Sequence, residues 1–205
     1  MRSTMSIRQG SAIAVMCAGL MAASPLTGAE TGVLAEFTAT TANMSPGSGE
    51  TVKIDVLRWS TDAERNELMS LVEKGDTPLF DGLKAKPSVG YIWTSGAVGY
   101  PIRYAYRVPL PDGGERVIVV TDLQLGVWDR NNVWKASGQP AAANYPFTLI
   151  EMRLNRRGIG DGKLSLASKV TVDRENKTLA LEDYAAAPIL LKSVTRGRSA
   201  EHPAS

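Results

Sequence analysis

The sequence has almost none of the residues that most catalytic and metal sites use. Among its 205 residues there is one cysteine, Cys17, and one histidine, His202. Both lie near the ends of the chain, and a folded core without them cannot hold a Ser-His-Asp triad, a cysteine nucleophile or an ordinary zinc or copper site. Carboxylate chemistry, lysine chemistry, oxygen-ligated metals and binding without chemistry remain.

The first 29 residues have the pattern of a secretory signal peptide. Arg2 and Arg8 precede a short apolar run over 12–23, and small residues at 27–29 offer a cleavage site. The run is shorter than the about 20 residues that a membrane-spanning helix needs. We therefore expect an exported protein, periplasmic or extracellular. The expected boundaries are a signal peptide at 1–29, a single β-rich domain at 30–196 and a disordered tail at 197–205.

The expected mature chain also lacks net charge and disulfides. Cleavage removes Arg2 and Arg8 from the 23 basic residues, which leaves 21 against 21 acidic residues. A neutral chain is a poor candidate for binding nucleic acid or an anionic membrane surface. No second long apolar run follows, so we expect no transmembrane segment after cleavage. About 176 residues are enough to bury a core without disulfides, and the oligomeric state is not indicated.

The clearest local signals lie between residues 51 and 75. Apolar residues alternate through 51–56, which is typical of a strand with one buried face. Thr61 and Glu64 then have the spacing of a capping box, so we expect a helix over about 62–74. A second short helix over 78–85 completes a two-helix insertion at 61–85. The apolar face of the first helix carries Leu68, Leu71 and Val72.

The rest of the chain reads as strands separated by turns. The segment 100–108 alternates so that its odd and even positions are expected to face opposite sides, and the turn at 111–114 closes it onto the next strand. The fold expected is all-β, an antiparallel sandwich or partly open barrel of about eight or nine strands with the short two-helix insertion. The predicted strands cover 33–43, 51–59, 88–95, 100–108, 116–121, 146–154, 162–172 and 177–183, with 187–194 as a possible further strand.

Four segments together resemble a family of uncharacterised secreted bacterial proteins. They read RWSTDAERNELMSLVEKG, PLPDGGERVIVVTD, YPFTLIEMRLN and GDGKLSLASKVTVDRENKTLALEDY. The similarity covers roughly residues 36 to 195. It implies one coherent domain in an exported protein, and it implies no activity, cofactor or catalytic residue.

Aromatic residues give the best binding candidates. Tyr91, Trp93, Tyr100, Tyr104 and Tyr106 concentrate in one predicted hairpin, where they either stack sugars or pack in the core. The segment 129–145 shows no periodicity, and long loops of this kind often carry function. Two tryptophans lie in or beside it. The residues proposed for binding are Trp134, Trp128, Tyr100 and Tyr104.

Other patterns are weaker. The glycine-rich segment 158–163 is followed by a strand, so it reads as a hairpin turn and not as a phosphate loop. Asp129, Asn131 and Asn132 offer too few oxygens for calcium. We expect no cofactor, no metal and no catalytic residue. The leading hypothesis is a non-enzymatic domain that binds an unknown ligand or envelope component. The alternative is a carboxylate-dependent glycan hydrolase, which needs two acids facing each other across a cleft.

Overall fold

The structure is a computed structural model that describes residues 32–45, 47, 49–95, 99–125, 134–139, 147–165, 169–175, 178–183 and 187–197. Most of these residues are in strands, and two helices lie between the third and fourth strands. The helices are α1 (Asp62–Val72) and α2 (Asp76–Lys84). The strands are β1 (Ala35–Thr41), β2 (Met44–Ser45), β3 (Thr51–Val56), β4 (Gly90–Thr94), β5 (Tyr100–Ile102), β6 (Tyr104–Pro109), β7 (Glu115–Thr121), β8 (Lys135–Ala136), β9 (Thr148–Leu154), β10 (Ile159–Ser165), β11 (Lys169–Asp173), β12 (Thr178–Asp183) and β13 (Ile189–Arg196).

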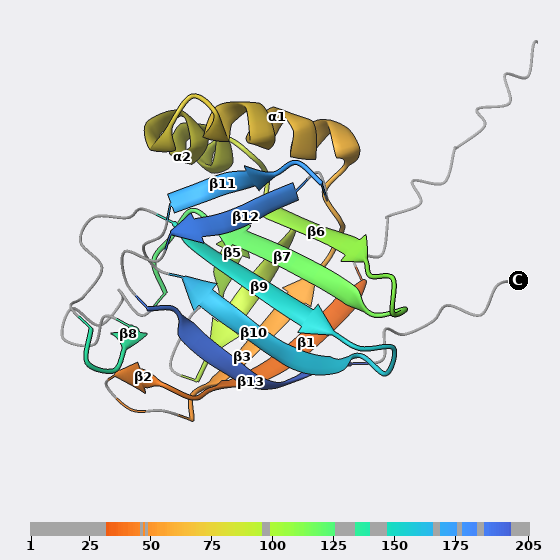
Figure 1. Cartoon of the computed structure of the whole chain (residues 1–205), viewed down its shortest axis with the longest axis vertical. Helices are drawn as coiled ribbons and strands as arrows, with labels where there is room; N and C mark the ends of the chain where they lie inside the picture. Colours follow the sequence, from red (N-terminus) through yellow and green to blue (C-terminus); the bar gives the residue numbers. More distant parts are fainter. Residues whose placement is uncertain are drawn as a thin grey trace, which may run out of the picture. The chain divides into compact units, whose positions relative to one another are not determined.

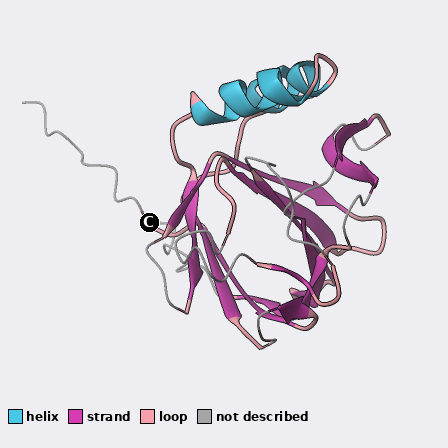
Figure 2. Ribbon diagram, turned by 90° about the vertical axis from the view of Figure 1, so that its left-hand side faces the viewer, coloured by secondary structure: helices cyan, strands magenta, loops and turns pink. Residues whose placement is uncertain are grey.

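One antiparallel sheet organises the fold (Figure 1). Its nine strands run in the order β5-β4-β3-β1-β13-β10-β9-β7-β6. Only Arg103 separates the two edge strands β5 and β6 in the chain, so the sheet curls round until it is nearly closed into a barrel, as Figure 2 shows. The all-β fold with a helical insertion is confirmed, and of the two architectures expected the structure has the barrel.

The near-closure depends on a shift in side-chain direction at Arg103. Tyr100 and Ile102 belong to the interior cluster, and so does Ala105, three positions later instead of two. Tyr104 therefore packs on the outer face, in a separate cluster. The alternation over 100–108 predicts that Tyr100 and Tyr104 face the same side of one regular strand, and this prediction was wrong. The chain instead pairs with β4 before Arg103 and with β7 after it, and the change of partner strand interrupts the alternation.

Polar contacts of Arg103 hold this shift in place. Its backbone N–H donates to Val120 O at 2.8 Å, and its Nε donates to Asp122 Oδ1 at 2.9 Å. A further guanidinium nitrogen donates to Lys86 O at 3.0 Å, which ties the chain after α2 to the same point. Asp122 is buried, so the carboxylate of the Arg103–Asp122 ion pair has little contact with water.

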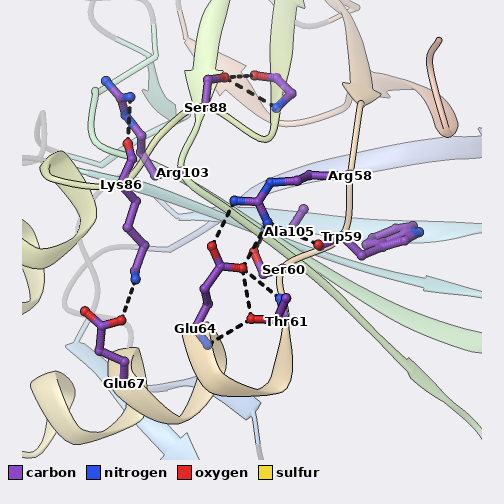
Figure 3. Close-up of polar contacts among 11 residues, drawn as sticks. Arg58, Trp59, Ser60, Thr61, Glu64, Glu67, Lys86, Ser88, Arg103 and Ala105 are labelled. Atoms are coloured by element: carbon purple, nitrogen blue, oxygen red, sulfur yellow. Dashed lines mark hydrogen bonds and ion pairs between the residues drawn. The ribbon is translucent and has the colours of Figure 1, made fainter. Parts of the chain in front are cut away.

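The segment after β3 lies beside β6, where Ser60 is next to Ala105 (Figure 3). The backbone N–H of Ser60 donates to Ala105 O at 2.7 Å, and Ser60 Oγ accepts from the Ala105 N–H at 3.1 Å. Thr61 then begins α1 with the predicted capping box, which is confirmed. Arg58 reaches both oxygens of Glu64, at 2.9 and 2.8 Å. These hydrogen bonds to Arg58 are the main reason that the pKa of Glu64 falls to about 2.

Two apolar clusters stabilise the domain. The first fills the interior of the sheet, with side chains such as Phe37, Ile54 and Met152. The second lies between the outer face of β6, β7 and β9 and a cover made of α1, α2 and the β11–β12 hairpin (Figure 1). Leu68 of α1 is fully buried there, as predicted, whereas Leu71 and Val72 are partly buried against the same cluster.

The β11–β12 hairpin corrects one strand assignment. The alternation over 162–172 predicted a single strand, but the structure has β10 and β11 in different sheets. Leu164 lies in the interior cluster and Val170 in the outer one. Two ion pairs attach the hairpin to its surroundings, Arg116 to Asp173 and Arg174 to Glu73, each at 2.9 Å.

The last predicted strand is confirmed as β13, which pairs with both β1 and β10. Within the described ranges, neither helix has the length and apolar character needed to cross a membrane.

Candidate functional site

The aromatic residues chosen from the sequence do not come together on the surface. Tyr100 lies in the interior cluster and Tyr104 in the outer cluster, and both are fully buried. Trp134 is 7% exposed and packs against the interior cluster. Trp128 lies outside the described residues. A stacking platform needs exposed rings, and the three described side chains do not supply them.

Trp134 lies at one end of the barrel interior, which we call the Trp134 end. The short strand β8 follows it directly, and Ala136 in β8 pairs with Met44 in β2. Both Met44 and Leu125 belong to the interior cluster together with Trp134. Trp134 therefore helps to close this end of the barrel, and its ring is a packing element.

An exposed aromatic pair lies instead on the outer face of β4. Gly90 and Ile92 of this strand are buried, so Tyr91 and Trp93 between and after them point outwards. Tyr91 is 37% exposed and Trp93 is 39% exposed, which is unusual for rings of this size. Their ring centroids are 5.9 Å apart and the rings are inclined by 42°.

Neighbouring groups fix the indole of Trp93 in one orientation. Its Nε1–H donates to Asp55 Oδ2 at 2.8 Å. A Cβ atom placed on Gly99 would come within 2.9 Å of the Trp93 ring, so only glycine fits beneath the indole without moving it. The exposed ring is therefore oriented by Asp55 through its N–H and lies close to the backbone of Gly99.

Charged side chains line the adjacent strands. In the sheet register Lys53 is opposite Trp93, and Asp55 is opposite Tyr91. Lys53 forms ion pairs with Glu36 at 3.0 Å and with Asp55 at 3.4 Å. The hydrogen bond to Glu36 is the main factor that raises the pKa of Lys53. The outer face of β1, β3 and β4 thus places hydrogen-bonding charges beside two exposed rings, and we call this surface the Tyr91–Trp93 face.

A pocket lies at the end of the barrel opposite to the Trp134 end, and we call this end the Trp59 end. Trp59 follows β3 there and packs against the interior cluster. The pocket has a volume of about 580 Å³ and lies between the β6–β7 turn, the β9–β10 turn and the end of β13. Its charged lining residues are Arg107, Glu115, Arg156, Arg157 and Arg196.

The pocket does not provide the pair of acids that a glycan hydrolase needs. Among the described residues, Glu115 is the only carboxyl group that lines it, and Arg196 binds that group at 2.9 Å. Within the described residues no three or more His, Cys, Asp or Glu side chains gather where a metal ion could be held. The three residues considered for calcium, Asp129, Asn131 and Asn132, lie outside the described residues.

Comparisons with known proteins found no match: no family model, no curated protein and no solved structure matches the chain.

Proposed function

We propose that the protein is an exported, non-enzymatic binding domain and that it binds carbohydrate on the Tyr91–Trp93 face. One observation carries the proposal: a pair of exposed aromatic rings lies on the outer face of a sheet, and a hydrogen bond to Asp55 orients one of them, Trp93. The C–H faces of sugars pack on aromatic rings, and the same rings exclude water from one side of the ligand. A ring that is already fixed loses little conformational entropy when the ligand binds.

The charges beside the rings suit the hydroxyl groups of a sugar. Lys53 offers donors and Glu36 offers acceptors, and both side chains are partly exposed. Asp55 is buried and contacts Lys53 and Trp93. Lys53 lies on β3, next to β4, and Glu36 lies on β1, the strand beyond β3, so both flank the rings from one side. Apolar contact from the rings and hydrogen bonds from this row would act on the same ligand. Such a combination of an apolar platform and a few placed polar groups is typical of small-molecule sites.

Carbohydrate binding can be tested with a glycan array followed by calorimetric titration of the strongest ligand. Tyr91→Ala should weaken binding by roughly tenfold or more, equivalent to about 1.4 kcal/mol. Trp93→Phe should weaken binding less than Trp93→Ala does, since it retains an aromatic ring while it loses the larger indole face and the hydrogen bond to Asp55. Ile159→Ala is the matched control, because Ile159 is also an exposed apolar side chain, 43% exposed, but lies on β10.

Two results would refute the proposal. The first is that no glycan on the array binds saturably. The second is that Ile159→Ala reduces affinity as much as Tyr91→Ala does, since the loss would then not depend on the aromatic face. Melting curves of each variant separate loss of the ligand site from loss of the fold.

Export is supported by the signal-peptide pattern in the first 29 residues and has its own test. Protein isolated from the producing cell should begin near Glu30. Edman sequencing of that protein is the measurement. A chain that retains Met1 or Met5 at its N-terminus would contradict export by cleavage and leave the carbohydrate proposal to be judged on the titrations.

A further inference from the structure

The pocket at the Trp59 end has an excess of positive charge. Four arginines and one glutamate line it, which gives a formal charge of +3. Arg196 is neutralised by Glu115 at 2.9 Å. None of the carboxylates in the described part of the chain forms an ion pair with Arg107, Arg156 or Arg157. These three arginines therefore line the same hollow without a counter-ion from the described residues.

The arginines are held by groups that leave their charge uncompensated. The guanidinium of Arg107 lies 5.3 Å from the ring centroid of Trp59, a contact that orients the group by its face and leaves its N–H edges available. Arg156 donates from Nε to the carbonyl oxygen of Asp112. Neither partner carries a full negative charge. Two of the three guanidinium groups are thus fixed in position before any ligand arrives.

The turns that carry these residues are also well defined. In the β9–β10 turn the side-chain oxygen of Asn155 accepts from the backbone N–H of Arg157 at 2.8 Å and from that of Ile159 at 3.2 Å. Gly158 in the same turn has a φ of +71°, which other residues rarely adopt. The β6–β7 turn is closed by Asp112, which accepts from the Gly114 N–H at 2.9 Å. Arg156 and Arg157 are therefore presented by a rigid scaffold.

We propose that this pocket is an oxyanion-binding site that takes the phosphate or carboxylate group of a small molecule. Guanidinium groups bind both kinds of oxyanion through paired N–H donors. A hollow of about 580 Å³ holds a molecule of monosaccharide size along with its charged group. The site is separate from the Tyr91–Trp93 face, and neither proposal depends on the other.

The test is calorimetric titration of the full chain at low ionic strength, where screening is weakest. The probes are glucose 6-phosphate, glucuronate and inorganic phosphate, with glucose as the neutral reference. At least one of the three anions should bind saturably and with an affinity that falls as salt is added. Binding of the phosphorylated sugar alone, of the sugar acid alone or of free phosphate each supports an oxyanion site and identifies its source.

Matched arginine substitutions locate the binding. Arg157→Gln should weaken binding of the anion by about tenfold, the loss of one charge-assisted contact. Arg153→Gln removes the same charge from an exposed position on β9 outside the pocket and should change affinity by less than about twofold, as expected for a screened surface charge. Glu115→Gln should strengthen binding, because it removes the acid that lines the described part of the pocket and frees Arg196.

The proposal fails if none of the anions binds saturably, or if Arg153→Gln costs as much affinity as Arg157→Gln. It fails also if Glu115→Gln weakens binding while the variant keeps the melting temperature of the wild type. Arg157 lies in an exposed turn, so its replacement leaves the fold intact and the titration interpretable.

Discussion

Replacing Trp134 with alanine distinguishes a packing role from a binding role. Trp134 is 7% exposed and packs against the interior cluster at its end of the barrel. Removing so large a buried side chain costs both its transfer free energy and the cavity that it leaves. From this burial we expect Trp134→Ala to lower the free energy of unfolding by about 3–5 kcal/mol.

The matching change in melting temperature is large enough to measure directly. For a domain of this size, each 1 kcal/mol shifts the midpoint by about 2–4 °C, so a loss of about 4 kcal/mol corresponds to roughly 8–16 °C. Thermal unfolding followed by circular dichroism, with urea unfolding as a second measurement, gives both quantities. Ile159→Ala is the control, since it truncates an exposed apolar side chain and should change stability by less than about 0.5 kcal/mol, as most surface substitutions do.

A loss below about 1 kcal/mol for Trp134→Ala would refute the reasoning, since it would place the ring at the surface, where most substitutions are nearly neutral. The same result would return Trp134 to the list of binding candidates. A large loss of stability removes it from that list, and with it the reason to look for a ligand at the Trp134 end.

Two further expectations concern α1 and its cap. Leu68→Ala should cost about 2–5 kcal/mol, and Leu71→Ala should cost less, because Leu68 is fully buried and Leu71 only partly so; chemical denaturation of the two variants compares them. The pKa of Glu64 is lowered in the folded state to about 2, so its contribution to stability is present above pH 4.5 and is lost as pH falls towards 2. Because Arg58 is 41% exposed and partly screened, we expect this contribution to be only about 1 kcal/mol, measured as the difference in pH dependence between wild type and Glu64→Gln.

Local signals in the sequence predicted those elements that depend on neighbouring residues. The capping box of Thr61 and Glu64 was visible because both partners lie within one turn of helix. The strands β1, β3 and β7 were visible because their alternation matches one buried face or a continuous buried run. In each case the residues that define the element are close together in the chain.

The bend at Arg103 depends on residues far apart in the chain. Its partners Lys86 and Asp122 come from segments on either side in the sequence, and nothing local to the alternation of 100–108 indicates a change of direction. The split between β10 and β11 is similar, since Leu164 and Val170 keep an alternating pattern while they serve different clusters. Hydrophobic periodicity reports that a side chain is buried and does not report which core buries it.

The two candidate sites differ in how clearly the sequence indicates them. Tyr91 and Trp93 belong to the aromatic hairpin recognised in the sequence, and their alternation with Ile92 indicates that they lie on the face opposite to it. The arginine pocket had no comparable signal, because Arg107, Arg157 and Arg196 come from three separate segments that only the barrel brings together.

The way the core is filled explains why both candidate sites lie outside it. A barrel of eight or nine strands has an interior that side chains fill or that holds one small ligand. Here bulky residues such as Phe37 and Ile54 occupy the described interior, with Trp59 and Trp134 packed against the same cluster. The helices and the β11–β12 hairpin cover the outer face of β6, β7 and β9. Among the described elements, the flank formed by β1, β3 and β4 and the turns at the Trp59 end then remain accessible. The exposed rings of Tyr91 and Trp93 lie on the first of these, and the pocket arginines lie at the second.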